Sequence, residues 1–189
     1  MPNIACVIIA GGRSRRYGTN KALAELKGER LVDIVTRTLR AQTSGPVVVS
    51  AREEMRSAFG DLTVVTDLLN GDVGPLAGLH AAMTWAGDLG YDTVITTPVD
   101  TPSLPSNFIA KLLESKPPSI AHYDGHIQPL HGVWLSSQAY ELKQRIESGT
   151  RAGRRWAEIC HANECDFAVD KAKHHFANIN RPEDLVKLL

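Results

Sequence analysis

The chain has 189 residues, 43% of them hydrophobic and 22% charged, and its 21 basic side chains balance 21 acidic ones. These proportions are typical of a globular protein with a buried core, and the zero formal charge argues against a surface built for nucleic acid or membrane. The N-terminal apolar run has only about seven residues and no basic leader, so we interpret it as a buried strand rather than a signal peptide or membrane span. Three cysteines, Cys6, Cys160 and Cys165, without a secretion signal favour a reducing cytoplasm.

Short apolar runs alternate with amphipathic stretches over the first 115 residues. Runs with the length of strands lie at residues 4–10, 46–51, 62–66 and 93–97. Helical stretches lie at residues 31–42, 74–86 and 105–115. This alternation predicts βαβ units and an α/β fold of three layers, with a mostly parallel, Rossmann-like sheet covered by helices on both faces.

The pattern changes after Pro117-Pro118. Two further strands are expected around Asp124-Gly125, which is a hairpin-type turn signal, at residues 119–123 and 127–135. A helix over 137–148, a basic stretch over 149–156 and a short helix from Pro182 would complete the chain. Because we find no repeat and no low-complexity segment, we interpret residues 1–189 as a single domain.

A glycine-rich basic loop follows the first predicted strand. The stretch "IAGGRSRRYGTNK" at residues 9–21 holds three glycines, four cationic side chains and no acidic one. Glycine lets backbone N–H groups approach an anion closely, and Arg and Lys add positive charge, so this loop is suited to phosphates. Its spacing is that of neither a P-loop nor a G-x-G-x-x-G dinucleotide loop. The alternative is a solvated basic loop without a ligand.

Ligands of parallel sheets bind beyond the carboxyl ends of the strands. That edge would gather three segments that are far apart in sequence, namely the loop at residues 11–21, Asp67 after the third strand and Asp100 after the fourth. The sequence therefore predicts a phosphate site in which cationic and acidic side chains meet.

Five motifs together resemble a known family. Residues 11–21 fit the GGxSxRxGxxK signature of small nucleotidyltransferases. Four motifs follow in order, GPLAG at 74–78, TPVDTP at 97–102, QPLHGVW at 128–134 and NINRPEDL at 178–185. Their order and spacing resemble the molybdenum cofactor guanylyltransferases over nearly the whole chain.

The resemblance implies a nucleotidyltransferase fold and a Mg²⁺-dependent reaction. The terminal phosphate of the molybdopterin (molybdenum) cofactor would attack the α-phosphate of GTP, releasing pyrophosphate and forming the guanine dinucleotide cofactor. Residues 1–116 would then be the nucleotide-binding part and residues 117–189 the acceptor side. We expect a cytoplasmic monomer with transient contacts to proteins that deliver or accept the cofactor, and no nucleic-acid or membrane partner.

Three residues are expected to be catalytic. Asp100 stands between two prolines after a buried strand and matches the family's metal-binding aspartate, so it would hold Mg²⁺. Lys21 and Arg16 would clamp the triphosphate and offset the charge of the leaving pyrophosphate. The alternative for Asp100 is a helix-capping or turn role.

Nucleotide binding is expected of Ile9, Ala10, Gly11, Gly12, Lys21, Asp67, Gly74, Gly78 and Asp100. In the family, an aspartate at the place of Asp67 contacts the nucleotide, through the guanine edge or the ribose hydroxyls; capping is the alternative. Gly78 either admits the base or eases helix packing. Ser50 would replace an asparagine that the family often has as a nucleotide contact.

Cofactor binding is expected of Arg154, Arg155, Asn178 and Asn180. The two arginines, with Arg151 and the ring of Trp156, would suit a phosphate and a pterin, although a solvated helix face has the same composition. The two asparagines match the family's C-terminal motif and would orient the cofactor or metal-bound water, while Asn180 could instead cap the helix from Pro182.

Two other clusters are interpreted as structural. Cys160, His161 and Cys165 with the histidines at 174–175 lack the spacing of a zinc site. His131 is expected to be a buried structural histidine.

Other function classes remain open at this stage. A CTP-dependent molybdopterin cytidylyltransferase or a sugar-phosphate nucleotidyltransferase would share the fold, and a non-catalytic nucleotide-binding adaptor would need less of the site. A dinucleotide oxidoreductase lacks its glycine fingerprint here.

Overall fold

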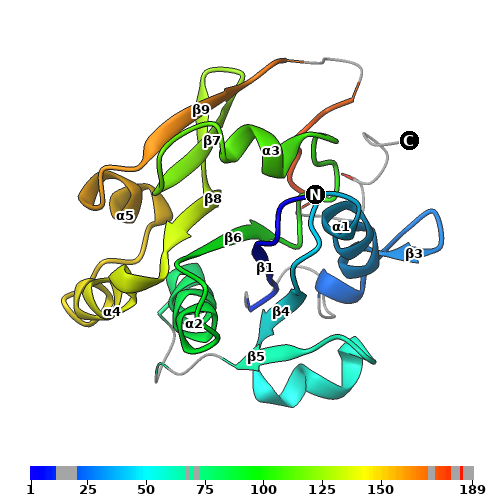
Figure 1. Ribbon diagram of the computed structural model, residues 1–189. Helices are drawn as coiled ribbons and strands as arrows, with labels where there is room; N and C mark the ends of the chain where they lie inside the picture. The colour runs from blue at the N-terminus through cyan, green and yellow to red at the C-terminus, as the bar shows by residue number, and fades with distance from the viewer. Residues whose placement is uncertain (12–20, 67–68, 70–72, 170–172, 180–183, 185–189) are drawn as a thin grey trace.

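The computed structural model describes residues 1–11, 21–66, 69, 73–169, 173–179 and 184. Its centre is a seven-stranded sheet of order β5-β4-β1-β6-β8-β7-β9 (Figure 1). The strands are β1 (Ala5–Ile9), β4 (Val47–Ala51), β5 (Val64–Thr66), β6 (Thr93–Pro98), β7 (Ser119–Tyr123), β8 (His126–Leu135) and β9 (Asn163–Phe167). A separate small hairpin pairs β2 (Glu25–Leu26) with β3 (Glu29–Arg30).

The first half of the sheet is parallel. Strands β5, β4, β1 and β6 all pair in parallel, β8 runs antiparallel to both β6 and β7, and β9 returns to a parallel pairing with β7. Every residue of β1 and of β4 is buried, as expected for central strands covered on both faces. The prediction of a mostly parallel sheet is confirmed.

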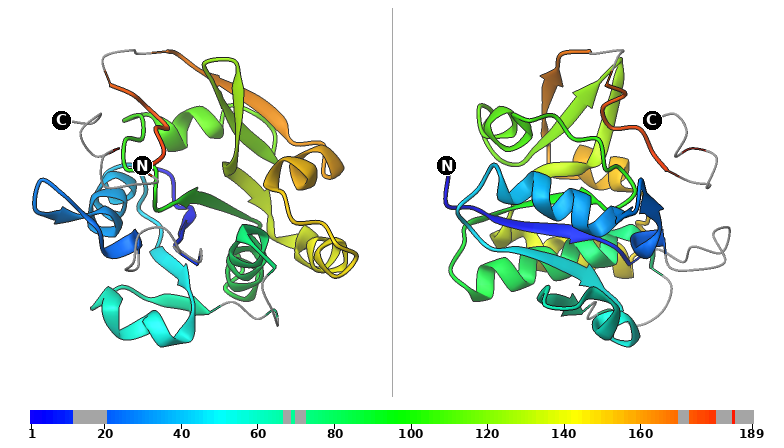
Figure 2. Two further views of the ribbon diagram at one scale, coloured as in Figure 1. Left: turned by 180° about the vertical axis from the view of Figure 1, so that it is seen from behind. Right: turned by 90° about the vertical axis from the view of Figure 1, so that its right-hand side faces the viewer.

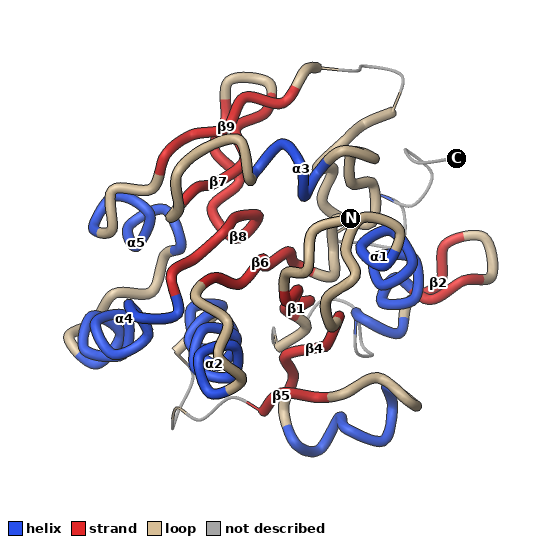
Figure 3. The backbone as a smooth tube through the Cα atoms, in the orientation of Figure 1, coloured by secondary structure: helices blue, strands red, loops and turns tan. Residues whose placement is uncertain are grey.

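Helices cover both faces of the sheet, so the three-layer prediction is also confirmed (Figure 3). On one face, α1 (Leu31–Arg40) and α3 (Phe108–Leu112) share one buried cluster with side chains of β1, β4 and β6. On the other face, α2 (Pro75–Asp88), α4 (Ala139–Glu147) and α5 (Gly153–Ile159) share a second cluster. Short 3₁₀ turns complete the described elements, η1 (Lys21–Leu23), η2 (Glu53–Phe59) and η3 (Ser136–Gln138).

Some elements differ from the sequence expectation. Strand β9 was not expected, because its sequence NECDF is polar and it lies at the sheet edge with three of five residues exposed. Helix α3 is shorter than the stretch 105–115 that we expected, and α5 lies within the basic stretch. The expected helix from Pro182 falls outside the described residues. None of the described helices has the length and apolar character that crossing a membrane requires.

The predicted hairpin between β7 and β8 is present. Asp124 and Gly125 have φ values of 49° and 75°, which is the signature of a two-residue type I′ turn. Near the other end of this pair, Gly132 faces the backbone of β7 so closely that a Cβ atom would lie 2.4 Å from the carbonyl oxygen of Ser119. Glycine at this position therefore sets how closely the two strands approach.

Replacing Gly132 with Ala should destabilise the protein by about 1–3 kcal/mol, because strand backbone must move to admit the methyl group. Urea unfolding of the variant measures this loss. The matched control is Gly87→Ala in α2, whose Cβ would meet Ser136 Cβ at 3.4 Å and whose helical site favours alanine by about 0.5–1 kcal/mol. Equal stability of the two variants would contradict the packing argument.

His131 on β8 is a buried structural histidine, as expected, with 3% of its surface exposed. The hydroxyl of Thr101 donates to the carbonyl of Pro98 at 3.0 Å, so its oxygen accepts from Nε2 of His131 at 2.7 Å. Burial lowers the pKa of His131 to about 3. The imidazole is therefore neutral in the folded protein over the whole physiological range.

This burial predicts a pH dependence of stability. Below the ordinary histidine pKa of about 6.5 the unfolded chain takes up a proton at His131 that the folded chain refuses, so stability is complete above that pH and falls as the solution is acidified. Between pH 7 and pH 5 this one group should cost about 1–2 kcal/mol. Urea unfolding of the wild type and His131→Gln at both pH values tests this, and the variant should lose less stability. Parallel pH profiles would overturn the assignment.

Candidate functional site

The carboxyl ends of three parallel strands lie side by side at one edge of the sheet. Ile9 at the end of β1 pairs with Ser50 of β4 on one side and with Pro98 of β6 on the other. The loops that follow these strands therefore share this edge, as the alternating pattern predicts. The segment after β1 leads to Gly11, and the segment after β6 leads to Asp100.

Lys21 and Asp100 meet at this edge. Nζ of Lys21 lies 2.8 Å from Oδ2 of Asp100, although the two residues are 79 positions apart. Their side chains are 14% and 24% exposed, so the pair is largely but not wholly removed from water. The expectation that Lys21 and Asp100 come together is confirmed by this contact, which is a charge-assisted hydrogen bond, while residues 12–20 of the glycine-rich loop lie outside the described residues.

Asn178 approaches the same carboxylate from the C-terminal segment. With its amide nitrogen turned toward Asp100, it donates to Oδ2 at 2.8 Å and to Oδ1 at 3.0 Å. The backbone N–H of Ile179 also donates to the backbone carbonyl of Asp100 at 2.8 Å. The C-terminal segment thus holds both the main chain and the side chain of Asp100.

A second set of contacts ties this segment to the loop after β6 (Figure 2). The backbone N–H of Phe176 donates to the carbonyl of Ser103 at 3.0 Å, and the hydroxyl of Ser103 donates to the carbonyl of Lys173 at 2.8 Å. The ring of Phe176 packs edge-on against His131 with 5.1 Å between centroids. Together these contacts fix the position of the segment that carries Asn178.

The chemistry of this cluster fits a divalent cation. Mg²⁺ prefers oxygen ligands and is commonly held by one or two carboxylates with phosphates and water completing its shell. Asp100 supplies a carboxylate, and the Asn178 amide supplies an oxygen next to it when it is turned the other way. Lys21 adds a positive charge at the same place for phosphate oxygens.

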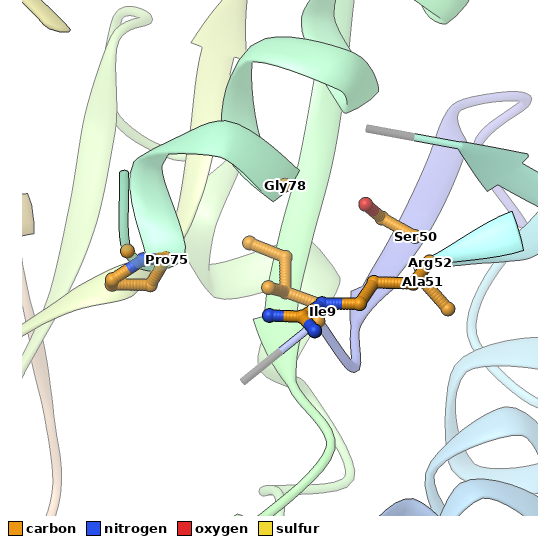
Figure 4. A pocket seen from close by; sticks show the side chains of 8 residues that line it. Ile9, Ser50, Ala51, Arg52, Pro75 and Gly78 are labelled. Atoms are coloured by element: carbon orange, nitrogen blue, oxygen red, sulfur yellow. The ribbon is translucent and has the colours of Figure 1, made fainter. Parts of the chain in front are cut away.

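A shallow hollow lies between the ends of β1 and β4 and the start of α2 (Figure 4). It is lined by Ile9, Gly11, Ser50, Ala51, Arg52, Gly74, Pro75 and Gly78. Four of the expected nucleotide residues therefore surround one space: Ile9, Gly11, Gly74 and Gly78. Ala10 is buried beside it and donates its N–H to the carbonyl of Ser50 at 2.8 Å.

The glycines of the hollow have physical reasons for their places. Gly74 has a φ of 74°, which side chains other than glycine rarely adopt, and it stands directly before Pro75, the first residue of α2. A Cβ on Gly78 would lie 3.0 Å from Cγ2 of Ile9 and 3.2 Å from Oγ of Ser50. Gly78 thus both packs closely on the strands and lines the hollow, so the two readings of this residue are compatible.

Sequence reasoning missed Arg52 as a lining residue. It recognised Ser50 in the same turn as a possible substitute for an asparagine, but nothing in the local sequence distinguishes Arg52 from any solvated arginine. Only the pairing of β4 beside β1 brings it to the hollow.

The basic stretch at the start of α5 is only partly as expected. Arg154 and Arg155 are exposed, and Arg155 pairs with Glu158 at 3.0 Å. The expectation that Trp156 offers its ring to a pterin is wrong, because the side chain is wholly buried in the core beneath α5. The stretch does begin beside the hollow, since a Cβ on Gly74 would lie 3.8 Å from the carbonyl oxygen of Arg151.

The remaining expected residues have different outcomes. Gly12, Arg16, Asp67 and Asn180 lie outside the described residues. All three cysteines are buried free thiols, and burial raises the pKa of Cys6 to about 12 and that of Cys160 to about 11. Within the described ranges, no group of three or more His, Cys, Asp or Glu side chains lies close enough together to hold a metal ion.

Comparisons with known proteins find similar chains and similar folds. A molybdenum cofactor guanylyltransferase from Rhizobium leguminosarum bv. trifolii is 36% identical, covering 97% of this chain and 90% of that protein. One from Yersinia pestis (strain Pestoides F) is 33% identical and covers 97% and 93%. The solved molybdopterin-guanine dinucleotide biosynthesis protein A from Archaeoglobus fulgidus has the same fold, with a TM-score of 0.74 and 24% identity over 98% of this chain and 96% of that one.

More distant structures share the fold as well. The 4-diphosphocytidyl-2C-methyl-D-erythritol synthase from Anaerococcus prevotii has a TM-score of 0.69 at 10% identity, covering 99% of this chain and 94% of that one. The model of the MobA-like NTP transferase domain matches residues 6–165, which is most of the chain. The family model and the curated relatives lead to one conclusion: the chain belongs to the family of MobA-like NTP transferase domains.

Proposed function

We propose that the protein transfers GMP from GTP to the terminal phosphate of the molybdopterin (molybdenum) cofactor. The observation that carries the proposal is the contact of Lys21 with Asp100 beside a hollow lined by glycines. A cationic clamp next to a carboxylate is what a triphosphate and its cation require. The names of relatives that are 33% and 36% identical over nearly the whole chain supply the acceptor.

The roles follow from the positions of the side chains. A phosphate oxygen of the cofactor attacks the α-phosphorus of GTP, the bond to the β-phosphate breaks, and pyrophosphate leaves. Lys21 would bind phosphate oxygens, and Asp100 with Asn178 would hold Mg²⁺. When bound, the cation neutralises charge on the triphosphate. The attacking phosphate is already an anion, so the reaction needs positioning and charge neutralisation rather than a strong general base or a covalent intermediate.

The proposal also covers cofactor binding, the cellular compartment and the oligomeric state of the enzyme. Arg154 and Arg155 are exposed on α5, which begins shortly after Arg151, and would bind the cofactor phosphate. Three buried free thiols suit a reducing cytoplasm. We include in the proposal a monomeric enzyme that has transient contacts with proteins delivering or accepting the cofactor.

The wild type should release pyrophosphate with GTP in preference to the other nucleotides. Replacing Asp100 with Ala should largely abolish this transfer. Loss of the carboxylate removes the proposed ligand of the cation and the group that Lys21 contacts at 2.8 Å, so we expect a loss of at least about 10²-fold in kcat. The measurement is pyrophosphate release with Mg²⁺ and molybdopterin cofactor, comparing GTP, CTP, ATP and UTP.

The control for this variant is Asp88→Ala, which removes an exposed carboxylate at the far end of α2. It should retain wild-type rates. Release with CTP in place of GTP would support a cytidylyltransferase instead, and no release with any nucleotide from a folded protein would favour the adaptor.

The paired variant Arg154→Ala/Arg155→Ala should raise KM for the molybdopterin cofactor about tenfold or more, because charge-assisted hydrogen bonds contribute about 1.5–3 kcal/mol each. KM for GTP should stay unchanged. Arg145→Ala, which removes an exposed arginine paired with Glu141 on α4, is the matched control. An unchanged KM for the cofactor in the paired variant would contradict this role and indicate that the two arginines only form a solvated helix face.

A further inference from the structure

We propose that Arg52 reads the guanine base of the nucleotide. The inference rests on the proposed function, because it takes GTP as the ligand of this edge. It assigns a specificity role to a residue that belongs to neither the glycine-rich loop nor the aspartate motif.

Arg52 occupies a defined place at the mouth of the hollow. It follows β4 directly, has an extended backbone with φ −71° and ψ 150°, and precedes the first turn of η2. Its side chain lines the hollow together with Ile9 and Pro75. In Figure 4 the guanidinium of Arg52 overlies Ile9 and reaches toward Pro75, away from the body of the strand that carries it.

Its neighbour Arg56 shows what an arginine with a purely structural role looks like here. Arg56 donates to both carboxylate oxygens of Glu53, at 2.6 and 2.8 Å, and to the hydroxyl of Thr66 at 3.2 Å. Within the described ranges, by contrast, the guanidinium of Arg52 has no hydrogen-bond or ion-pair partner. The N–H donors of Arg52 therefore make no hydrogen bond to the described residues and are available to a ligand in the hollow.

Few of the other residues that line the hollow have side chains that can form hydrogen bonds with a base. Ile9, Ala51 and Pro75 are apolar, the glycines offer backbone only, and Ser50 contributes a hydroxyl. Arg52 is the one charged side chain among the described residues of the lining. An apolar slot with one planar cation at its mouth would accept the flat face of a base and contact its edge.

The guanidinium fork matches guanine in particular. Guanine presents two neighbouring acceptors, O6 and N7, to which an arginine can donate two parallel hydrogen bonds. Adenine replaces O6 with an amino donor, and cytosine also presents an amino donor at its exocyclic nitrogen, so both would face the guanidinium with hydrogen atoms. Lysine cannot reproduce the bidentate contact, although it keeps the charge.

The position of Arg52 favours the base over the phosphates. Lys21 and Asp100 lie at the β1 and β6 side of the edge, whereas Arg52 follows β4 on the other side of β1. With strands about 4.8 Å apart, β4 and β6 are roughly 10 Å from each other. A nucleotide that places its phosphates at Lys21 and its base in the hollow would thus bring the base edge to Arg52.

The test is nucleotide binding by the full chain with Mg²⁺ and without the acceptor, measured by calorimetry. Arg52→Lys and Arg52→Ala should each weaken GTP about tenfold or more and leave ATP unchanged. The wild type should bind 7-deaza-GTP, which lacks the N7 acceptor, more weakly than GTP, whereas Arg52→Ala should bind the two equally. Arg40→Ala, which removes an exposed arginine at the end of α1, should bind like the wild type.

Other outcomes overturn the proposal in distinguishable ways. If Arg52→Ala weakened GTP and ATP equally while Arg52→Lys bound both normally, Arg52 would be a phosphate ligand. If every variant kept the wild-type preference for GTP, this inference alone would fail. If the folded wild type bound no nucleotide, the proposed function would fail with it.

Discussion

The site depends on keeping one carboxylate in a half-buried place at the end of β6. A carboxylate that loses water needs donors in return, and Asp100 finds them on Lys21 and Asn178, from opposite ends of the chain. The side-by-side pairing of β4, β1 and β6 makes this meeting possible. Without that strand order, the segments that carry Lys21 and Asp100 would not leave the sheet at the same edge.

Residues from the C-terminal third of the chain pack against the segment that carries Asp100. Strand β8 brings His131 to Thr101, the residue that follows Asp100, and to the ring of Phe176, which lies two residues before Asn178. A neutral, buried imidazole suits this place because it can donate to a hydroxyl without bringing a charge into an aromatic cluster. Packing that begins on β8 thus helps to fix the position of the carboxylate at the end of β6.

The sequence predicted the features that local patterns encode. Continuous apolar runs predicted β1, β4 and β6. Because ligands of parallel sheets lie at the carboxyl ends of the strands, the sequence also predicted that Lys21 and Asp100 lie close together. Features that depend on tertiary contacts could not be predicted from the sequence. Strand β9 is polar because it lies at an edge, and the burial of Trp156 depends on which face of α5 meets the sheet. The amide contact of Asn178 with Asp100 has no local signal at all.

Different positions along the sheet edge would therefore bind different parts of a nucleotide. The pair of Lys21 and Asp100 lies around the ends of β1 and β6, where a triphosphate would lie, and a hollow with a single described cation, Arg52, lies on the β4 side. Because these groups follow different strands, the loop after β4 can change without disturbing the carboxylate and its donors. In this arrangement the groups that would contact the base follow β4, and the carboxylate with its donors lies on the β6 side of β1.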